Sequence, residues 1–215
     1  MSDSGPTGSG AARVAWAAGP ERRRLAEAAR ALLDVVVRSG ADPATLADAA
    51  EAIEILTARL ASPAFERTID IAPDSHRREM SLVSGRSHPF APQVEMQPVG
   101  EGYQGTVTLG PAWEGGPGLV HGGAVSLLFD HVMAWATTRV GRPGPSMTGT
   151  MSLAYRRPTP LGVPLTITAR VERVAGRKIS IVAQLTVDGQ VTVEGSGLFI
   201  KLTEEHYDRV YRLSS

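Results

Sequence analysis

Residues 119–136 read LVHGGAVSLLFDHVMAWA, and the prediction of the fold starts from this stretch. Apolar side chains fall on nearly every side of a helix over residues 122–138, which predicts that this helix is buried. Asp130 and His131 interrupt the apolar pattern. A carboxylate is rarely buried unless it is paired, because its desolvation is costly. Asp130 is therefore either a structural carboxylate, held in a salt bridge or at a partly wet interface, or a functional group.

The segment His121-Gly122-Gly123 stands at the start of this helix. The first backbone N–H groups of a helix have no partner within it, and glycine lets a carbonyl oxygen approach them closely. Such amides can form an oxyanion hole, although a plain tight turn has the same pattern. His121 and Asp130 are nine residues apart, which places them about 180° around the helix axis and roughly 13 Å along it. If both ends act on one substrate, we expect them to come from different subunits.

Period-two alternation of apolar residues follows this helix. It predicts strands over residues 147–157, 163–174, 178–187 and 190–201, with a further alternating segment before the helix at 103–109. Gly176 and the pair Asp188-Gly189 are turn signals. Half-buried antiparallel strands need a covered face, and the apolar helix is the natural cover. The expected class is α+β, with an antiparallel sheet around a central helix.

Two amphipathic helices are predicted ahead of this domain. The first spans residues 20–39 and ends at Gly40; the second starts at Asp42-Pro43 and ends at Ser62-Pro63. We interpret this hairpin as a packing or oligomer contact, with a lid over the substrate as the alternative. The predicted organisation is a disordered tail (1–12), the hairpin (13–62), an irregular connector (63–92), the sheet-and-helix domain (93–202) and a C-terminal tail (203–215).

The composition excludes several classes of protein. Lysine plus arginine balance aspartate plus glutamate at 22 each, which gives no support for bulk nucleic-acid or membrane binding. The absence of cysteine excludes disulfides, thiolate metal sites and a cysteine nucleophile. The five histidines show no metal-ligand spacing, and no apolar run approaches the roughly 20 residues of a membrane span. We therefore expect a cytoplasmic enzyme or binding protein without a metal.

Several short motifs occur together in residues 93–202. The first is His121-Gly-Gly, then six residues, then Asp130, and the others are Trp113-Glu-Gly-Gly-Pro-Gly-Leu-Val-His121, Tyr155-Arg-Arg-Pro158, Arg157-Pro-Thr-Pro-Leu161, Gly176-Arg-Lys178 and Leu198-Phe-Ile-Lys-Leu202. In this order and spacing they resemble the hotdog-fold acyl-CoA thioesterases. The chain looks most similar to the PaaI-like group, which includes the mammalian THEM-type enzymes. The helical hairpin lies outside the resemblance.

The resemblance implies a role for several residues. Asp130 would be the nucleophile or the general base for water, and Thr148 would hold that water or orient the carboxylate. The amide of Gly122 would polarise the thioester carbonyl, with Gly123 beside it and His121 orienting the turn. Some relatives carry Asn or Gln six residues before that histidine, where this chain has Gly115. Coenzyme A belongs to the substrate, so no separate cofactor is expected.

The implied function is hydrolysis of an acyl-CoA to the free acid and coenzyme A by a homodimer or a dimer of dimers with shared active sites. Basic side chains should meet the coenzyme phosphates, and the candidates are Arg156, Arg157, Arg177 and Lys178; the alternative for each is ordinary solvated charge. Two other functions stay open. One is a non-catalytic acyl-CoA-binding protein, and the other is an enoyl-CoA hydratase or dehydratase, for which the helix lacks a matching Asp-to-His spacing.

Overall fold

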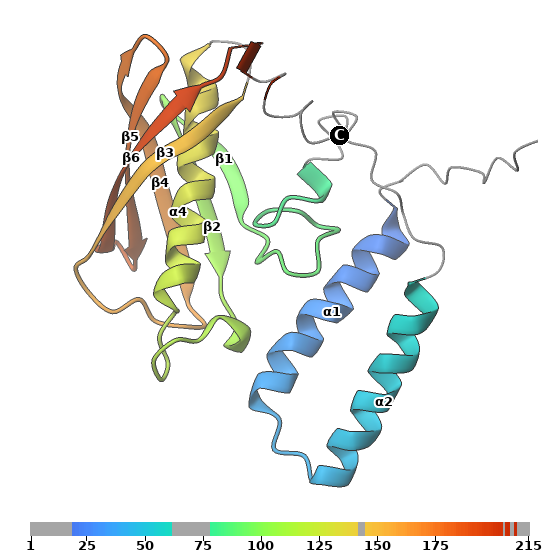
Figure 1. Ribbon diagram of the computed structural model, residues 1–215. Helices are drawn as coiled ribbons and strands as arrows, with labels where there is room; N and C mark the ends of the chain where they lie inside the picture. The colour runs from blue at the N-terminus through green and yellow to red at the C-terminus, as the bar shows by residue number, and fades with distance from the viewer. Residues whose placement is uncertain (1–18, 62–77, 142–144, 204, 207–208, 210–215) are drawn as a thin grey trace, which may run out of the picture.

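The computed structural model describes residues 19–61, 78–141, 145–203, 205–206 and 209. A six-stranded sheet curls around the helix α4 (Gly122–Ala136), and two helices, α1 (Pro20–Arg38) and α2 (Pro43–Leu60), stand beside this unit (Figure 1). The predicted α+β arrangement of an antiparallel sheet around a central helix is confirmed. The tail proposed for residues 1–12 lies outside the described residues, as does most of the C-terminal tail.

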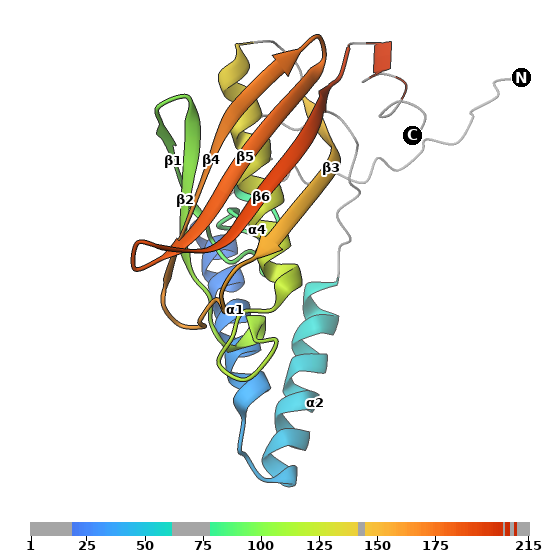
Figure 2. The ribbon, with the colours of Figure 1, turned by 90° about the vertical axis from the view of Figure 1, so that its left-hand side faces the viewer.

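All neighbouring strands of the sheet are antiparallel, in the order β1-β2-β4-β5-β6-β3. The strands are β1 (Glu95–Val99), β2 (Gly102–Thr108), β3 (Ser146–Tyr155), β4 (Pro164–Ala175), β5 (Lys178–Val187) and β6 (Gln190–Lys201). Figure 2 shows them from the outer face, with β1 and β3 at opposite edges. Asp188 and Gly189 both have positive φ angles, 48° and 76°, as a two-residue hairpin turn between β5 and β6 requires. This turn was predicted correctly.

The strand β1 was not predicted from the sequence, where the first predicted strand of the domain is the alternating segment at 103–109. Pro98 hides it, because proline cannot donate a backbone hydrogen bond and argues against a strand. In the structure β1 pairs with β2 alone and has an open outer edge. Proline is tolerated in such an edge strand, since half of its backbone groups have no partner strand.

The core lies between α4 and the concave face of the sheet. Buried residues of the helix, such as Leu128, Phe129 and Val132, meet the alternate residues of the strands that point inward. Close approach is possible because of glycine: a Cβ atom at Gly195 would lie 2.7 Å from the Phe129 ring, and one at Gly105 would lie 2.9 Å from Val132. These contacts fix the distance between α4 and the sheet, and this distance determines where the Asp130 side chain reaches the surface.

The helical hairpin is present at the predicted place, but its apolar faces remain open. Ala26 is the one buried residue of α1, and α2 has none. Polar contacts attach α1 to the rest: Arg23 pairs with Glu79, and the Asp34 carboxylate accepts from the Ala112 N–H at 2.9 Å. Within the described residues, no helix is long and apolar enough to cross a membrane.

Part of the predicted irregular connector is ordered. Residues 78–94 form turns, and Val83 and Val94 are buried in the main core, while Ala91 is fully buried. The Val94 N–H donates to the Val83 carbonyl at 3.1 Å. Apolar side chains without periodicity gave no pattern from which this packing could be predicted.

Candidate active site

Asp130 is half-buried on α4, one residue beyond the fully buried Phe129. Its carboxylate accepts a hydrogen bond of 2.7 Å from the Thr148 hydroxyl on the edge strand β3. None of the ion pairs in the described part of the chain includes Asp130. The alternative of a structural ion pair therefore finds no support. A carboxylate with one fixed oxygen and partial access to solvent is suited to act on water or on a carbonyl carbon.

The start of α4 is shaped by its N-cap residue, His121. The His121 ring nitrogen Nδ1 accepts a hydrogen bond from the Gly123 N–H at 2.9 Å. The Gly122 N–H has no hydrogen-bond partner among the described residues, and a Cβ atom at Gly122 would meet nothing nearer than the Tyr155 hydroxyl at 3.5 Å. Of the two glycines, Gly122 is thus the one with an amide free to donate to a substrate oxygen, while His121 orients the turn.

Two residues that the sequence analysis did not assign hold this turn from the other side. The Gly122 carbonyl accepts from the Tyr155 hydroxyl at 2.8 Å and from the Ser126 hydroxyl at 3.1 Å. The peptide between Gly122 and Gly123 is therefore fixed at both its oxygen and its nitrogen. Tyr155 belongs to one of the motifs quoted above, but only its contact with α4 reveals what it does; Ser126 gave no signal in the sequence.

Gly115 is explained by the same turn. A Cβ atom at this position would lie 2.8 Å from the His121 Cα, and the Gly115 N–H donates to the Leu119 carbonyl at 2.9 Å. A side chain here would displace the N-cap histidine. The side-chain amide found at this position in some relatives is thus incompatible with the present loop.

Gly122 and Asp130 of one chain lie far apart along α4. They are eight residues apart in a regular helix, which corresponds to about 12 Å along its axis. Gly122 contacts Tyr155 at the end of β3, whereas Asp130 contacts Thr148 near its start. The edge strand β3 is exposed over residues 147–150 and has no partner strand on its outer side among the described residues.

The four basic candidates for coenzyme A binding fall at two places. Arg156 and Arg157 follow β3 near Gly122; Arg156 pairs with Glu194 at 2.9 Å, and Arg157 donates to the Gln190 side chain at 2.6 Å. Arg177 and Lys178 are exposed in the turn between β4 and β5. This turn lies near the start of β3, because Ile200 pairs with Lys178 on one side and Met147 on the other. The structure therefore separates the two pairs.

His131 is not a partner of Asp130. No hydrogen bond joins the two side chains in the described structure, and the buried His131 Nε2 atom has no partner there. Burial lowers the pKa of His131 to about 4, against a smaller opposing effect of the Asp130 charge. The imidazole is neutral near pH 7, so His131 and Asp130 do not form an acid–base pair. No group of metal-ligating side chains occurs within the described residues.

Comparisons with known proteins show which family this chain belongs to. The family model described as "Thioesterase superfamily" matches residues 117–194. A crystal structure of a thioesterase superfamily protein has a TM-score of 0.74 and 36% sequence identity, over 87% of this chain and 94% of its own. The chain belongs to the thioesterase superfamily. The match to this superfamily member is longer than residues 93–215, so it also includes residues ahead of the sheet-and-helix domain. The resemblance to hotdog-fold thioesterases is confirmed.

Curated relatives within the superfamily match a shorter region. Acyl-coenzyme A thioesterase THEM4 from Xenopus laevis is 36% identical over 98 residues, which is 43% of this chain and 42% of that protein. The protein of the same name from Bos taurus is 33% identical over 98 residues, 45% of this chain and 39% of its own length. The chain thus spans less than half of the curated relatives it matches.

Proposed function

We propose that this protein is an acyl-CoA thioesterase that hydrolyses the thioester of a fatty or aromatic acyl-CoA to the free acid and coenzyme A. The observation that carries the proposal is the half-buried Asp130 carboxylate, which Thr148 holds at 2.7 Å on the helix whose Gly122 amide is free. Membership of the thioesterase superfamily and the names of the curated relatives support the same reaction. The reaction as proposed uses no cofactor besides the substrate's own coenzyme A.

The proposed chemistry needs one base and one oxyanion donor. Asp130 takes a proton from water, and the water oxygen bonds to the thioester carbonyl carbon. Negative charge develops on the carbonyl oxygen, where the Gly122 N–H stabilises it. When the intermediate collapses, the C–S bond breaks and the coenzyme leaves as a thiolate that recovers the proton. Direct attack by Asp130 would give an anhydride that water hydrolyses to the same products.

We propose further that two copies share each active site. The 12 Å between Gly122 and Asp130, estimated from helix geometry, supports a site made of Asp130 from one copy and Gly122 from another. The open edge of β3, which carries Thr148, supports a contact between copies at that place. A homodimer of this kind would contain two equivalent sites, and a dimer of dimers would contain four. The cytoplasmic location expected from the sequence remains a prediction.

The test is thiol release from a panel of short, long and aromatic acyl-CoAs by the wild type and by Asp130→Asn. We expect turnover by the wild type and a loss of about 1000-fold or more in kcat for the variant, because Asn can neither accept the proton nor attack. Asp48→Asn, an exposed position on α2, is the matched control and should keep full activity.

Three results would contradict the proposal. Binding of acyl-CoA without hydrolysis by the wild type would favour a non-catalytic binding protein. Conversion of an enoyl-CoA to the hydroxyacyl-CoA without thiol release would favour a hydratase. Equal activity of Asp130→Asn and the wild type would remove Asp130 from the reaction.

A further inference from the structure

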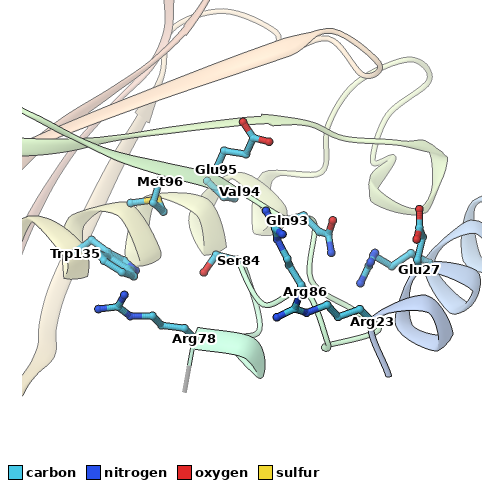
Figure 3. Close-up of a pocket in the computed structure, with 11 residues that line it drawn as sticks. Arg23, Glu27, Arg78, Ser84, Arg86, Gln93, Val94, Glu95, Met96 and Trp135 are labelled. Atoms are coloured by element: carbon cyan, nitrogen blue, oxygen red, sulfur yellow. The ribbon is translucent and has the colours of Figure 1, made fainter. Parts of the chain in front are cut away.

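A hollow of about 670 Å³ lies between α1, residues 78–94, β1 and the end of α4. Figure 3 shows Trp135, Met96 and Arg78 gathered at one end of this hollow and Arg23 and Glu27 at the other. We call it the arginine-lined hollow, since four guanidinium groups line it, against the two carboxylates of Glu27 and Glu95. Its arginines are Arg23, Arg30, Arg78 and Arg86. All four precede residue 93, outside the region that matches the superfamily model.

Two of these arginines are engaged by the protein itself. Arg23 forms an ion pair with Glu79, and Arg30 donates to the His88 carbonyl at 2.9 Å. These contacts fix the wall of the hollow that α1 provides. They also hold α1 against residues 78–94, so these two walls of the hollow are fixed relative to each other.

The other two guanidinium groups belong to Arg78 and Arg86, which are exposed and form no ion pair with any described residue. Neither Arg78 nor Arg86 has a hydrogen bond or ion pair with a side chain in the described part of the chain. Arg78 lies over the Trp135 ring, with 5.9 Å between its guanidinium carbon and the ring centre. Guanidinium groups bind carboxylates and phosphates in a fixed, planar geometry.

The arginine-lined hollow is separate from the candidate active site of the same chain. Trp135 follows Asp130 by five residues, which places it about 140° further around the axis of α4. The hollow contains residues of β1, whereas Asp130 contacts β3, and these strands form opposite edges of the sheet. Within one chain, the hollow and Asp130 therefore lie on different sides of α4 and at opposite edges of the sheet.

We propose that the arginine-lined hollow binds an organic anion. Its acidic group contacts Arg78 and Arg86, and its planar or apolar part lies against Trp135 and Met96. Two sources share this chemistry: the carboxylate of a free acyl acid and the phosphates of a nucleotide. This proposal rests on the hollow alone and does not depend on thioesterase activity.

The test is a titration of the full chain with octanoate and with ADP, followed by isothermal calorimetry and by tryptophan fluorescence. We expect saturable binding of one of these anions and no binding of the neutral counterparts octanol and adenosine. Arg78→Gln and Arg86→Gln should each weaken binding about tenfold or more, because each removes a charge-assisted hydrogen bond. Arg86→Lys keeps the charge and should retain part of the affinity. Arg59→Gln on α2 is the control and should bind as the wild type does.

The two ligands distinguish the two kinds of anion site. Binding of octanoate alone identifies a carboxylate site, and binding of ADP alone identifies a phosphate site. The proposal is overturned if neither anion binds, or if binding survives both Arg78→Gln and Arg86→Gln, since the ligand would then lie outside the arginine-lined hollow. Trp135→Phe, measured by calorimetry, provides a further variant if an arginine variant does not fold; it should also weaken binding.

Discussion

The hydroxyl of Thr148 is the closest partner of the carboxylate proposed to act on the thioester. A hydrogen bond to a charged group contributes about 1.5–3 kcal/mol, and its loss during catalysis corresponds to roughly 10–100-fold in rate. Thr148→Val has nearly the same shape but lacks the donor, so we expect kcat to fall by roughly that factor while KM changes little. Thr148→Ser should restore most of the rate in the same acyl-CoA assay.

Thr150→Val provides the control for this experiment, because Thr150 lies on the same strand and is exposed. An equal loss of kcat in Thr150→Val and Thr148→Val would show that valine in β3 lowers the rate in general, whether or not the position contacts Asp130. Unchanged kinetics in Thr148→Val would show that the hydrogen bond to Asp130 has no part in the reaction.

His131 gives a prediction about stability and pH. Its pKa is about 4 in the fold, below the ordinary value of 6.5, because burial disfavours the charged ring. Below pH 6.5 the unfolded chain binds a proton at His131 that the folded chain does not, so stability falls from about pH 6.5 towards about pH 4. Between about pH 7.5 and pH 5 this group alone should lower the free energy of unfolding by about 2 kcal/mol.

The variant His131→Gln should therefore lose less stability than the wild type over that range, as urea denaturation at the two pH values would measure. A pH dependence that is the same in His131→Gln and the wild type would mean that His131 titrates alike in both states.

At the scale of elements, the hairpin has apolar faces that none of the described residues covers. Among the residues that the structure describes, eleven of the 17 exposed large hydrophobic residues belong to α1 and α2. On α2, Leu46, Ile53 and Leu60 recur every seven residues with Leu56 between them, which is the spacing of a coiled-coil seam. A seam of this kind is complementary to another copy of itself, so we expect the hairpins of two copies to pack together.

The variant Leu56→Asp places a charge in this seam and should reduce the molar mass measured by light scattering to that of the next smaller assembly, with specific activity retained. Ile55→Asp is the matched control, since Ile55 is exposed on the same helix but about 100° away. An unchanged mass in Leu56→Asp would refute the contact. Lost activity at unchanged mass would support the alternative that the hairpin is a lid over the substrate.

At the scale of the whole molecule, a mixing experiment tests whether two copies contribute residues to each active site. Asp130→Asn and Gly122→Val should each be inactive alone. When the two are unfolded, mixed in equal amounts and refolded together, half of the random dimers contain one of each. Each mixed dimer holds one site with both Asp130 and Gly122 intact, so about a quarter of the wild-type activity should return. Activity that stays at the level of the separate variants would place the whole site within one chain.

Much of the fold followed from periodicity along the chain. The apolar residues of β5 alternate, as in a strand, and those of α4 lie on nearly every side, as in a buried helix. Both patterns involve only residues that are close together in the sequence. The turn at Asp188-Gly189 was predictable for the same reason, because those residue types tolerate positive φ. Pro98 concealed β1, since its tolerance there depends on the strand's place at the edge of the sheet.

The sequence by itself determined that this protein has a buried helix with Asp130, an N-terminal His-Gly-Gly turn and an antiparallel sheet, and its motifs pointed to Thr148. Only the tertiary structure decided which groups meet: Thr148 with Asp130, Tyr155 with the Gly122 carbonyl, and Trp135 with Arg78. It also left Gly122 rather than Gly123 with a free amide. These pairs are separated by 18 to 57 positions, and such contacts depend on strand register and on the height of α4 over the sheet, which no local pattern specifies.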